Sequence, residues 1–196
     1  MAAPSGSGKT TLVQALVKLH PELRFSISYT TRSRRSNEVD GIDYLFVDER
    51  EFATLIDDGA LLEHAEVFDN HYATSRAQVV EHLKNDHHVI LEIDWQGARQ
   101  VRESMPDCIT IFILPPSHEE LVRRLKDRRT DSNEVINRRL RDAVSDMSHW
   151  DEFDFVVIND DLNKAVAEVE AVLAGDATQQ ATTNEALRGA IAAIVG

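Results

Sequence analysis

The sequence predicts an α/β fold, in which helices flank a parallel sheet and a mixed, β-rich lobe is inserted after the second strand. Three observations support this prediction. Outside residues 28–84, short apolar runs alternate with stretches of helical periodicity, as in the βα units of a parallel sheet. Within residues 28–84, short strand patterns dominate. A glycine-rich loop at residues 4–8 opens directly into the first helix.

The individual elements follow from apolar spacing and from residues that begin or end helices. Helical spacing predicts helices at residues 10–19, 49–56, 75–83, 96–104, 117–126, 132–149, 162–173 and, with the weakest pattern, 184–195. Short apolar or alternating runs predict strands at residues 25–29, 44–47, 60–67, 88–93, 108–114 and 153–158. We expect a loop at residues 68–71 and a polar linker at residues 175–183.

Composition excludes several classes of function. The 196-residue chain carries a formal net charge of −13, which repels polyanions such as nucleic acid and anionic lipid. No stretch is long and apolar enough to span a bilayer, and the first residues lack the features of a secretion signal, so we expect a cytoplasmic protein. Cys108, the single cysteine, cannot form an internal disulfide and is expected to be a buried, inert thiol.

Positive charge is concentrated at two places in this acidic chain. Ten of the sixteen arginines fall into two groups: Arg32, Arg34 and Arg35, and then Arg123, Arg124, Arg128, Arg129, Arg138, Arg139 and Arg141. Guanidinium groups bind phosphate oxygens in a bidentate way, so the two groups predict sites for small, highly charged anions. Solvated helix faces with neighbouring acids are the alternative for about half of the second group.

The glycine-rich loop fits the phosphate-loop pattern from its second glycine onward and departs from it at the first, where Ala3 stands. Glycines let successive backbone N–H groups turn inward around a phosphate, and the following helix adds the positive end of its dipole. We therefore predict a P-loop NTPase fold that binds ATP. Lys9 would reach the β- and γ-phosphates, Thr10 would supply a hydroxyl ligand to Mg²⁺, and Thr11 would contact the α-phosphate. The predicted ATP-binding residues here are Pro4, Ser5, Gly6, Ser7, Gly8, Lys9, Thr10 and Thr11.

Two acids follow the apolar run at residues 89–91. Glu92 and Asp94 occupy alternate positions, and hence one face of a strand, so either can serve the nucleotide site. We assign Glu92 to the metal. For Asp94 the alternative is that it only caps the helix that follows it.

Between residues 4 and 161 the sequence resembles the guanylate kinase family. The stretches that carry the resemblance are Pro4-Ser5-Gly6-Ser7-Gly8-Lys9, Ser28-Tyr29-Thr30-Thr31-Arg32-Ser33-Arg34-Arg35, Glu38-Val39-Asp40-Gly41-Ile42-Asp43-Tyr44, Leu62-Glu63-His64-Ala65-Glu66-Val67, Asn70-His71-Tyr72-Ala73-Thr74-Ser75, Glu92-Ile93-Asp94-Trp95-Gln96-Gly97, Ile113-Leu114-Pro115-Pro116-Ser117 and Asn159-Asp160-Asp161. The resemblance implies a Mg²⁺-dependent enzyme that moves the γ-phosphoryl group of ATP onto GMP.

The resemblance also implies roles for individual residues. Those expected to hold the GMP phosphate are Arg32, Arg35, Tyr44 and Tyr72, and those expected to recognise guanine are Ser28, Glu63, Thr74 and Asp94. The chemistry agrees, since a carboxylate such as Glu63 can accept hydrogen bonds from N1–H and the 2-amino group of guanine together. Adenine offers no such pair of donors. Arg128 and Arg139 are expected to reach the transferring phosphates, and Asn159 to lie near the adenine.

The implied organisation has a core, a GMP-binding lobe and a helical lid. The expected boundaries are 1–27 for the phosphate loop and first helix, 28–84 for the GMP-binding lobe, 85–118 for core, 119–141 for the lid, 142–175 for core and 176–196 for a tail. Ala73, Arg34 and Arg129 depart from the usual glycine, proline and glycine of the family. The first strand of the sheet is also expected to be missing, which would leave the phosphate loop without an N-terminal anchor.

Three other functions stay open at this level. A related, non-catalytic binding module would keep the fold without ATP chemistry, although the retained Lys9, Thr10 and arginines favour an enzyme. The chain could also be an inactive kinase that lacks its first strand, or a phosphotransferase for another acceptor. The expected partners are ATP and GMP, with no nucleic acid and no membrane, and a homo-oligomer is left open.

Overall fold

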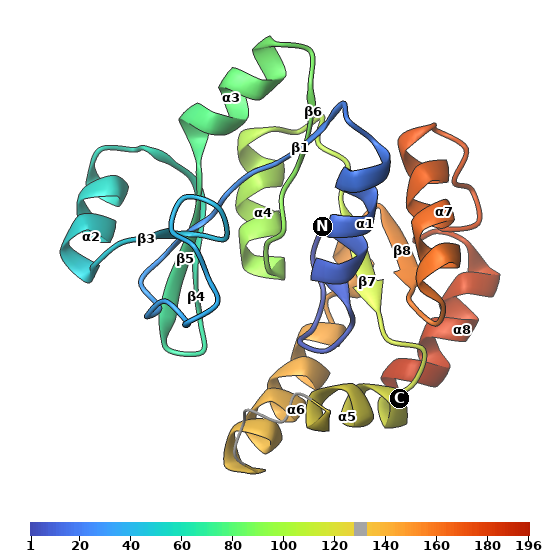
Figure 1. The fold of residues 1–196 in the computed structure, drawn as a ribbon. Helices are drawn as coiled ribbons and strands as arrows, with labels where there is room; N and C mark the ends of the chain where they lie inside the picture. The colour runs from blue at the N-terminus through green and yellow to red at the C-terminus, as the bar shows by residue number, and fades with distance from the viewer. Residues whose placement is uncertain (128–132) are drawn as a thin grey trace. The chain divides into compact units, whose positions relative to one another are not determined.

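The computed structural model describes residues 1–127 and 133–196 (Figure 1). The chain divides into two compact units. One comprises residues 1–16 and 109–196, and carries the glycine-rich loop. The other comprises residues 17–108, and carries the first group of arginines.

The unit of residues 1–16 and 109–196 is built on two parallel strands and the helices around them (Figure 1). Its elements are α1 (Lys9–Leu19, which continues into the other unit), β7 (Ile111–Leu114), α5 (His118–Lys126), α6 (Asn133–Met147), a 3₁₀ turn (Trp150–Glu152), β8 (Phe155–Ile158), α7 (Leu162–Leu173) and α8 (Glu185–Val195). Every residue of β7 is buried, as expected for a strand covered on both faces. Helix α7 packs on β8 through its buried stripe, Ala165, Val166, Val169 and Val172.

Ala2 extends this parallel pair by a single residue. It is fully buried, its N–H donates to the carbonyl of Ile111 at 2.9 Å, and its carbonyl accepts from the N–H of Ile113 at 2.8 Å. The expectation that the phosphate loop has no N-terminal anchor is therefore wrong. Ala2, which lies two residues before the loop, is held to β7 through both its N–H and its carbonyl.

The unit of residues 17–108 contains a mixed sheet and a separate parallel pair. Its elements are β1 (Leu23–Phe25), β2 (Tyr29–Thr30), β3 (Leu45–Phe46), α2 (Glu49–Asp57), β4 (Leu61–Val67), β5 (Asn70–Ser75), α3 (Arg76–Lys84), β6 (His88–Ile90) and α4 (Trp95–Ser104). The mixed sheet has the order β3-β2-β5-β4, and β1 pairs with β6 in parallel. Helix α4 packs on β4, and a core of Phe52, Leu61 and Ala73 joins α2 to the sheet.

Short polar side chains fix where the helices begin. In each case a side-chain oxygen of the residue before the helix accepts a backbone N–H of the first turn, which would otherwise lack a partner. The capping residues are Asp48, Ser75, Asp94, Ser117, Asp161 and Asn184. The predicted helices are confirmed within one or two residues at each end. None of the helices in residues 1–127 and 133–196 combines the length and apolar character needed to cross a bilayer.

Three local predictions are wrong. The single strand expected at residues 25–29 is two strands, because Ser26 donates to Ile90 at the end of β1 and the chain then turns to pair Tyr29 in another sheet. The loop expected at residues 68–71 is a tight turn at Phe68 and Asp69, with φ of 51° and 63°, after which β5 begins. Cys108 is half-buried, since β7 begins only at Ile111.

Candidate active site

The glycine-rich loop has the backbone shape that its composition predicts. Gly6 and Gly8 have φ of 93° and 85°, values that side chains rarely tolerate. The N–H of Ser7 turns back to the carbonyl of Pro4 at 3.3 Å, and α1 begins at Lys9, the residue after Gly8. Successive backbone N–H groups and the start of a helix therefore lie in one short segment, which is the arrangement that binds phosphate.

Side chains of the same unit pack against the loop. A Cβ at Gly6 would lie 2.9 Å from Cδ1 of Leu121, and one at Gly8 would lie 2.5 Å from Nδ2 of Asn159. The buried amide of Asn159 donates from Nδ2 to the carbonyl of Ser7 at 2.7 Å. Both glycines are therefore needed for space as well as for conformation. In this structure the side chain of Asn159, expected near the adenine, holds the phosphate loop.

Arg124 of helix α5 is a second support for the loop. Its Nη1 donates to the carbonyl of Ser7 at 3.4 Å, and its Nη2 donates to the carbonyl of Asn159 at 3.0 Å. Its Nε donates to Glu120 at 2.7 Å. Hydrogen bonds from Arg123 and Arg124 lower the pKa of the Glu120 carboxyl to about 2. Glu120 therefore stays ionised at neutral pH and holds the Arg124 guanidinium beside the loop.

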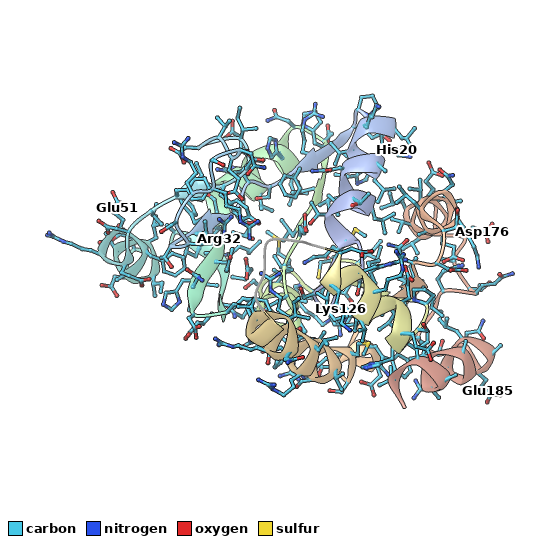
Figure 2. All side chains as sticks on the ribbon, turned by 60° about the horizontal axis from the view of Figure 1, so that its bottom comes forward. His20, Arg32, Glu51, Lys126, Asp176 and Glu185 are labelled. Carbon is cyan, nitrogen blue, oxygen red and sulfur yellow. The ribbon has the colours of Figure 1, made fainter. Side chains whose placement is uncertain are left out.

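The other residues predicted to act on ATP are placed as follows. Lys9 and Thr10 begin α1, and Thr10 and Thr11 are exposed. Arg139 lies in α6 and is half-buried. Arg128 lies outside the described residues, which stop at Asp127 and resume at residue 133. Lys126, the last residue of α5, is labelled in Figure 2.

In the other unit, the residues predicted to recognise guanine include a buried, hydrogen-bonded acid. Glu63 of β4 and Thr74 of β5 are paired in the antiparallel ladder. Both are buried, with 4% and 1% exposure, and the Thr74 hydroxyl donates to Oε1 of Glu63 at 2.6 Å. The Thr74 hydroxyl therefore gives one oxygen of this carboxylate a hydrogen-bond donor in a place where water is scarce.

Asp94 caps the start of helix α4, next to Gly97. Its Oδ1 accepts from the N–H of Gly97 at 2.8 Å, so the helix-cap interpretation is confirmed. A Cβ built on Gly97 would lie 2.3 Å from Oε2 of Glu63 and 3.2 Å from Oδ1 of Asp94. Both carboxylates therefore lie against Gly97. Ser28 lies just before β2, is half-buried, and accepts from the N–H of Leu45 through its carbonyl.

Three of the four residues predicted to hold the GMP phosphate form one cluster. The Arg32 guanidinium, labelled in Figure 2, lies over the rings of Tyr44 and Phe46, with Cζ 5.3 and 5.8 Å from their centroids. The rings of Tyr44 and Tyr72 meet edge to face, 6.0 Å apart. The hydrogen bond with Glu38 is the largest cause that raises the pKa of Arg32. Partial burial lowers this pKa by less, and a hydrogen bond with Tyr72 raises it further.

Glu38 connects Arg32 to Arg35, the fourth predicted residue. Its carboxylate accepts from Nη1 and Nη2 of Arg32 at 3.0 and 2.7 Å, a bidentate pair whose side chains are 16% and 10% exposed. The same carboxylate accepts from the backbone N–H of Arg35 at 2.8 Å. The Arg35 side chain is 62% exposed, with Nη1 3.9 Å from Glu38. One acid thus fixes the segment that carries both arginines.

The residues predicted to bind metal belong to different units. Thr10 lies in the unit with the phosphate loop, and Glu92 follows β6 in the other. Burial, and next the charge of Glu92, raises the pKa of the Tyr44 phenol, which therefore stays a hydrogen-bond donor at neutral pH. In the described residues no group of three or more His, Cys, Asp or Glu could hold a metal ion. A hydroxyl and a carboxylate are nevertheless the hard oxygen ligands that suit Mg²⁺ beside phosphate oxygens.

Comparison with known proteins identifies the family. The guanylate kinase family profile matches residues 1–176. The chain belongs to the guanylate kinase family. It is 54% identical over 172 residues to the guanylate kinase of Alkalilimnicola ehrlichii, covering 88% of this chain and 85% of the relative. It is 44% identical over 195 residues to that of Coxiella burnetii, covering 100% and 95%. The crystal structure of guanylate kinase from Anaplasma phagocytophilum superposes with a TM-score of 0.73 at 33% identity, covering 93% and 89%.

Membership of the guanylate kinase family confirms the predicted fold class.

Three residues of the site have no role predicted from sequence. Arg124 was counted only within an arginine group, and its i, i+4 spacing from Glu120 was the available signal. Glu38 stands six residues after Arg32 in a segment without regular structure, so no periodicity predicts their pairing. Gly97 lies inside a helix, where glycine is unfavourable, and this was a usable signal.

Glu38→Gln is expected to destabilise the protein in a pH-dependent way. The hydrogen bonds from Arg32 hold the pKa of Glu38 below its usual value, so the ion pair stabilises the fold above the unfolded-state pKa and is lost as the pH falls through the lowered value. Thermal melts at pH 7 should therefore show a lower Tm for the variant by a few degrees, and the difference should shrink on acidification below pH 4. Glu81→Gln, at an exposed site on α3, is the control. An equal Tm difference at every pH would contradict this role.

Proposed function

We propose that the chain transfers the γ-phosphoryl group of ATP to GMP, giving ADP and GDP, in a Mg²⁺-dependent reaction. The observation that carries the proposal is the buried Glu63 carboxylate, held by Thr74 and packed, like Asp94, against Gly97. Membership of the guanylate kinase family supports the same reaction. The cytoplasmic location and the homo-oligomer stay predictions.

Glu63 has the chemistry to select guanine. Guanine presents N1–H and the 2-amino group on one edge, and a carboxylate can accept from both donors together. One oxygen of Glu63 already accepts from Thr74, so its carboxylate is held in one orientation. A purine without these donors would leave the buried acid without its ligand, and such mismatches are costly. Asp94 and Ser28 would complete the recognition of the base.

Arg32, Arg35, Tyr44 and Tyr72 would bind the GMP phosphate. Two guanidinium groups and two phenols provide cationic and neutral donors for a dianion. The raised pKa of Tyr44 supports this role, because the phenol stays protonated and donates. The Arg35 side chain, 62% exposed, is able to reorient toward a ligand at little cost.

The phosphate loop would bind the triphosphate of ATP. Residues 4–11 supply backbone N–H groups and the start of α1, with Lys9 reaching the β- and γ-phosphates. Asn159 would lie near the adenine while its amide supports the loop. Thr10, with Glu92, would hold Mg²⁺ among phosphate oxygens. When bound, this ion supplies positive charge that neutralises the triphosphate.

Phosphoryl transfer needs positioned positive charge more than it needs a base. Lys9, Arg128 and Arg139 would place cations around the transferring group and stabilise the charge on its oxygens. Arg128 and Arg139 belong to the proposed lid, residues 119–141, whose closure would exclude water and limit ATP hydrolysis. The division into core, GMP-binding lobe and lid is also part of this proposal. Its boundaries differ from those of the two compact units, which are divided after residues 16 and 108.

A coupled assay of ADP release with GMP, AMP, UMP and CMP as acceptors tests the proposal. We expect turnover with GMP alone. Turnover with another acceptor at a similar rate would indicate a different phosphotransferase. Absence of turnover, with GMP binding retained in calorimetry, would indicate a non-catalytic module or an inactive kinase.

Lys9→Ala should lower kcat by about a hundredfold or more while GMP affinity stays nearly unchanged, because Lys9 acts on ATP phosphates and belongs to the other unit. Steady-state kinetics and GMP calorimetry measure the two effects separately. Lys18→Ala, on the exposed surface of the same helix, is the control. Loss of GMP affinity at an unchanged rate is the result that excludes the assigned role.

Glu63→Ala should weaken GMP binding by about 1–3 kcal/mol, the usual cost of leaving a buried polar group without its partner. Glu66→Ala changes an exposed acid of the same strand and should leave binding unchanged. Isothermal titration of both variants with GMP makes the comparison. Equal GMP affinity in the wild-type chain and Glu63→Ala would mean that guanine is recognised elsewhere.

A further inference from the structure

Gly97 occupies a place where a side chain would displace the acid proposed to read guanine. It is the third residue of α4 and is buried in the first turn. An added Cβ would lie 2.3 Å from Oε2 of Glu63 and 3.0 Å from its Cδ. Contacts under about 3.0 Å are essentially never made by real Cβ atoms, so Glu63 would have to move.

Glu63 has little freedom to move. Its side chain is flexible in isolation, but the residue is only 4% exposed and Thr74 donates to its Oε1 at 2.6 Å. The added Cβ would also lie 3.2 Å from Oδ1 of Asp94, which accepts from the N–H of Gly97. Displacement of the Glu63 carboxylate therefore breaks or strains its hydrogen bond with Thr74.

We propose that Gly97 is a positioning residue for base selectivity: its missing side chain lets the Glu63 carboxylate lie against the first turn of α4, which Asp94 caps, so that the carboxylate faces the donor edge of guanine. This inference rests on the proposed GMP-kinase function and adds a determinant of its selectivity. Helix propensity opposes the glycine, since alanine is the better helix former. The space that Glu63 occupies explains why a glycine fits here.

The test compares Gly97→Ala with Gly189→Ala in the full chain. Gly189 is also inside a helix, α8, and a Cβ there would meet nothing within 4 Å. Calorimetry gives the affinities for GMP, for IMP, which lacks the 2-amino group, and for ATP. We expect Gly97→Ala to lose on the order of tenfold to a hundredfold in GMP affinity and to lower the preference for GMP over IMP. ATP affinity should be unchanged, and Gly189→Ala should bind all three like the wild-type chain.

A double-mutant cycle with Glu63→Ala separates positioning from general disruption. Once the carboxylate is removed, a methyl group at residue 97 has room, so Gly97→Ala should cause no further loss of GMP affinity. Likewise, Gly97→Ala should lower the Tm of the wild-type chain but should not lower the Tm of Glu63→Ala any further. This measurement needs no ligand. Additive losses of affinity and Tm would overturn the inference, as would a Gly97→Ala variant with unchanged selectivity. Failure of the wild-type chain to phosphorylate GMP would instead overturn the proposed function, and the Tm cycle would still test the packing.

Discussion

A buried carboxylate must have polar partners, and this constraint at Glu63 explains much of the unit of residues 17–108. The antiparallel register of β4 and β5 places Thr74 beside it as donor. That register depends on the turn at Phe68 and Asp69, whose positive φ values suit the twist of a short hairpin. A shift of one residue would carry Glu63 to the opposite face of the sheet. The register of the hairpin therefore decides whether Glu63 has its hydrogen-bond donor.

The phosphate loop is organised by a different constraint, the need to satisfy carbonyl groups while N–H groups stay available. The carbonyl of Ser7 accepts from Asn159 and Arg124, two side chains that reach the loop from distant parts of the chain. Ala2 fixes the other end through two hydrogen bonds to β7. With the Ser7 carbonyl turned toward these side chains, other backbone N–H groups of the loop can face an anion. Side chains distant in sequence thus support a loop whose backbone N–H groups are proposed to bind phosphate.

The sequence predicted most helices well because the capping residues are local signals: Asp48 and Ser75 mark the starts of α2 and α3 within a few residues. It predicted β5 poorly, because Asn70, His71 and Tyr72 are polar or half-buried and lack an apolar alternation. Strand pairing decided that segment, as the ladder with β4 supplies the backbone partners. Non-local hydrogen bonding is the information that a single sequence lacks.

The same distinction separates the predicted site residues from those that were missed. Arg32 and Tyr44 were assigned through family motifs, yet the contact that orders them passes through Glu38, which motif chemistry alone presents as one more surface acid. Gly97 is the opposite case, a residue without functional atoms whose importance is the volume it leaves to Glu63. Groups that bind a ligand can be inferred from their chemistry. Groups that position them leave weaker signals, such as a glycine inside a helix, and their role becomes clear when distances are known, because their effect is exerted on another side chain.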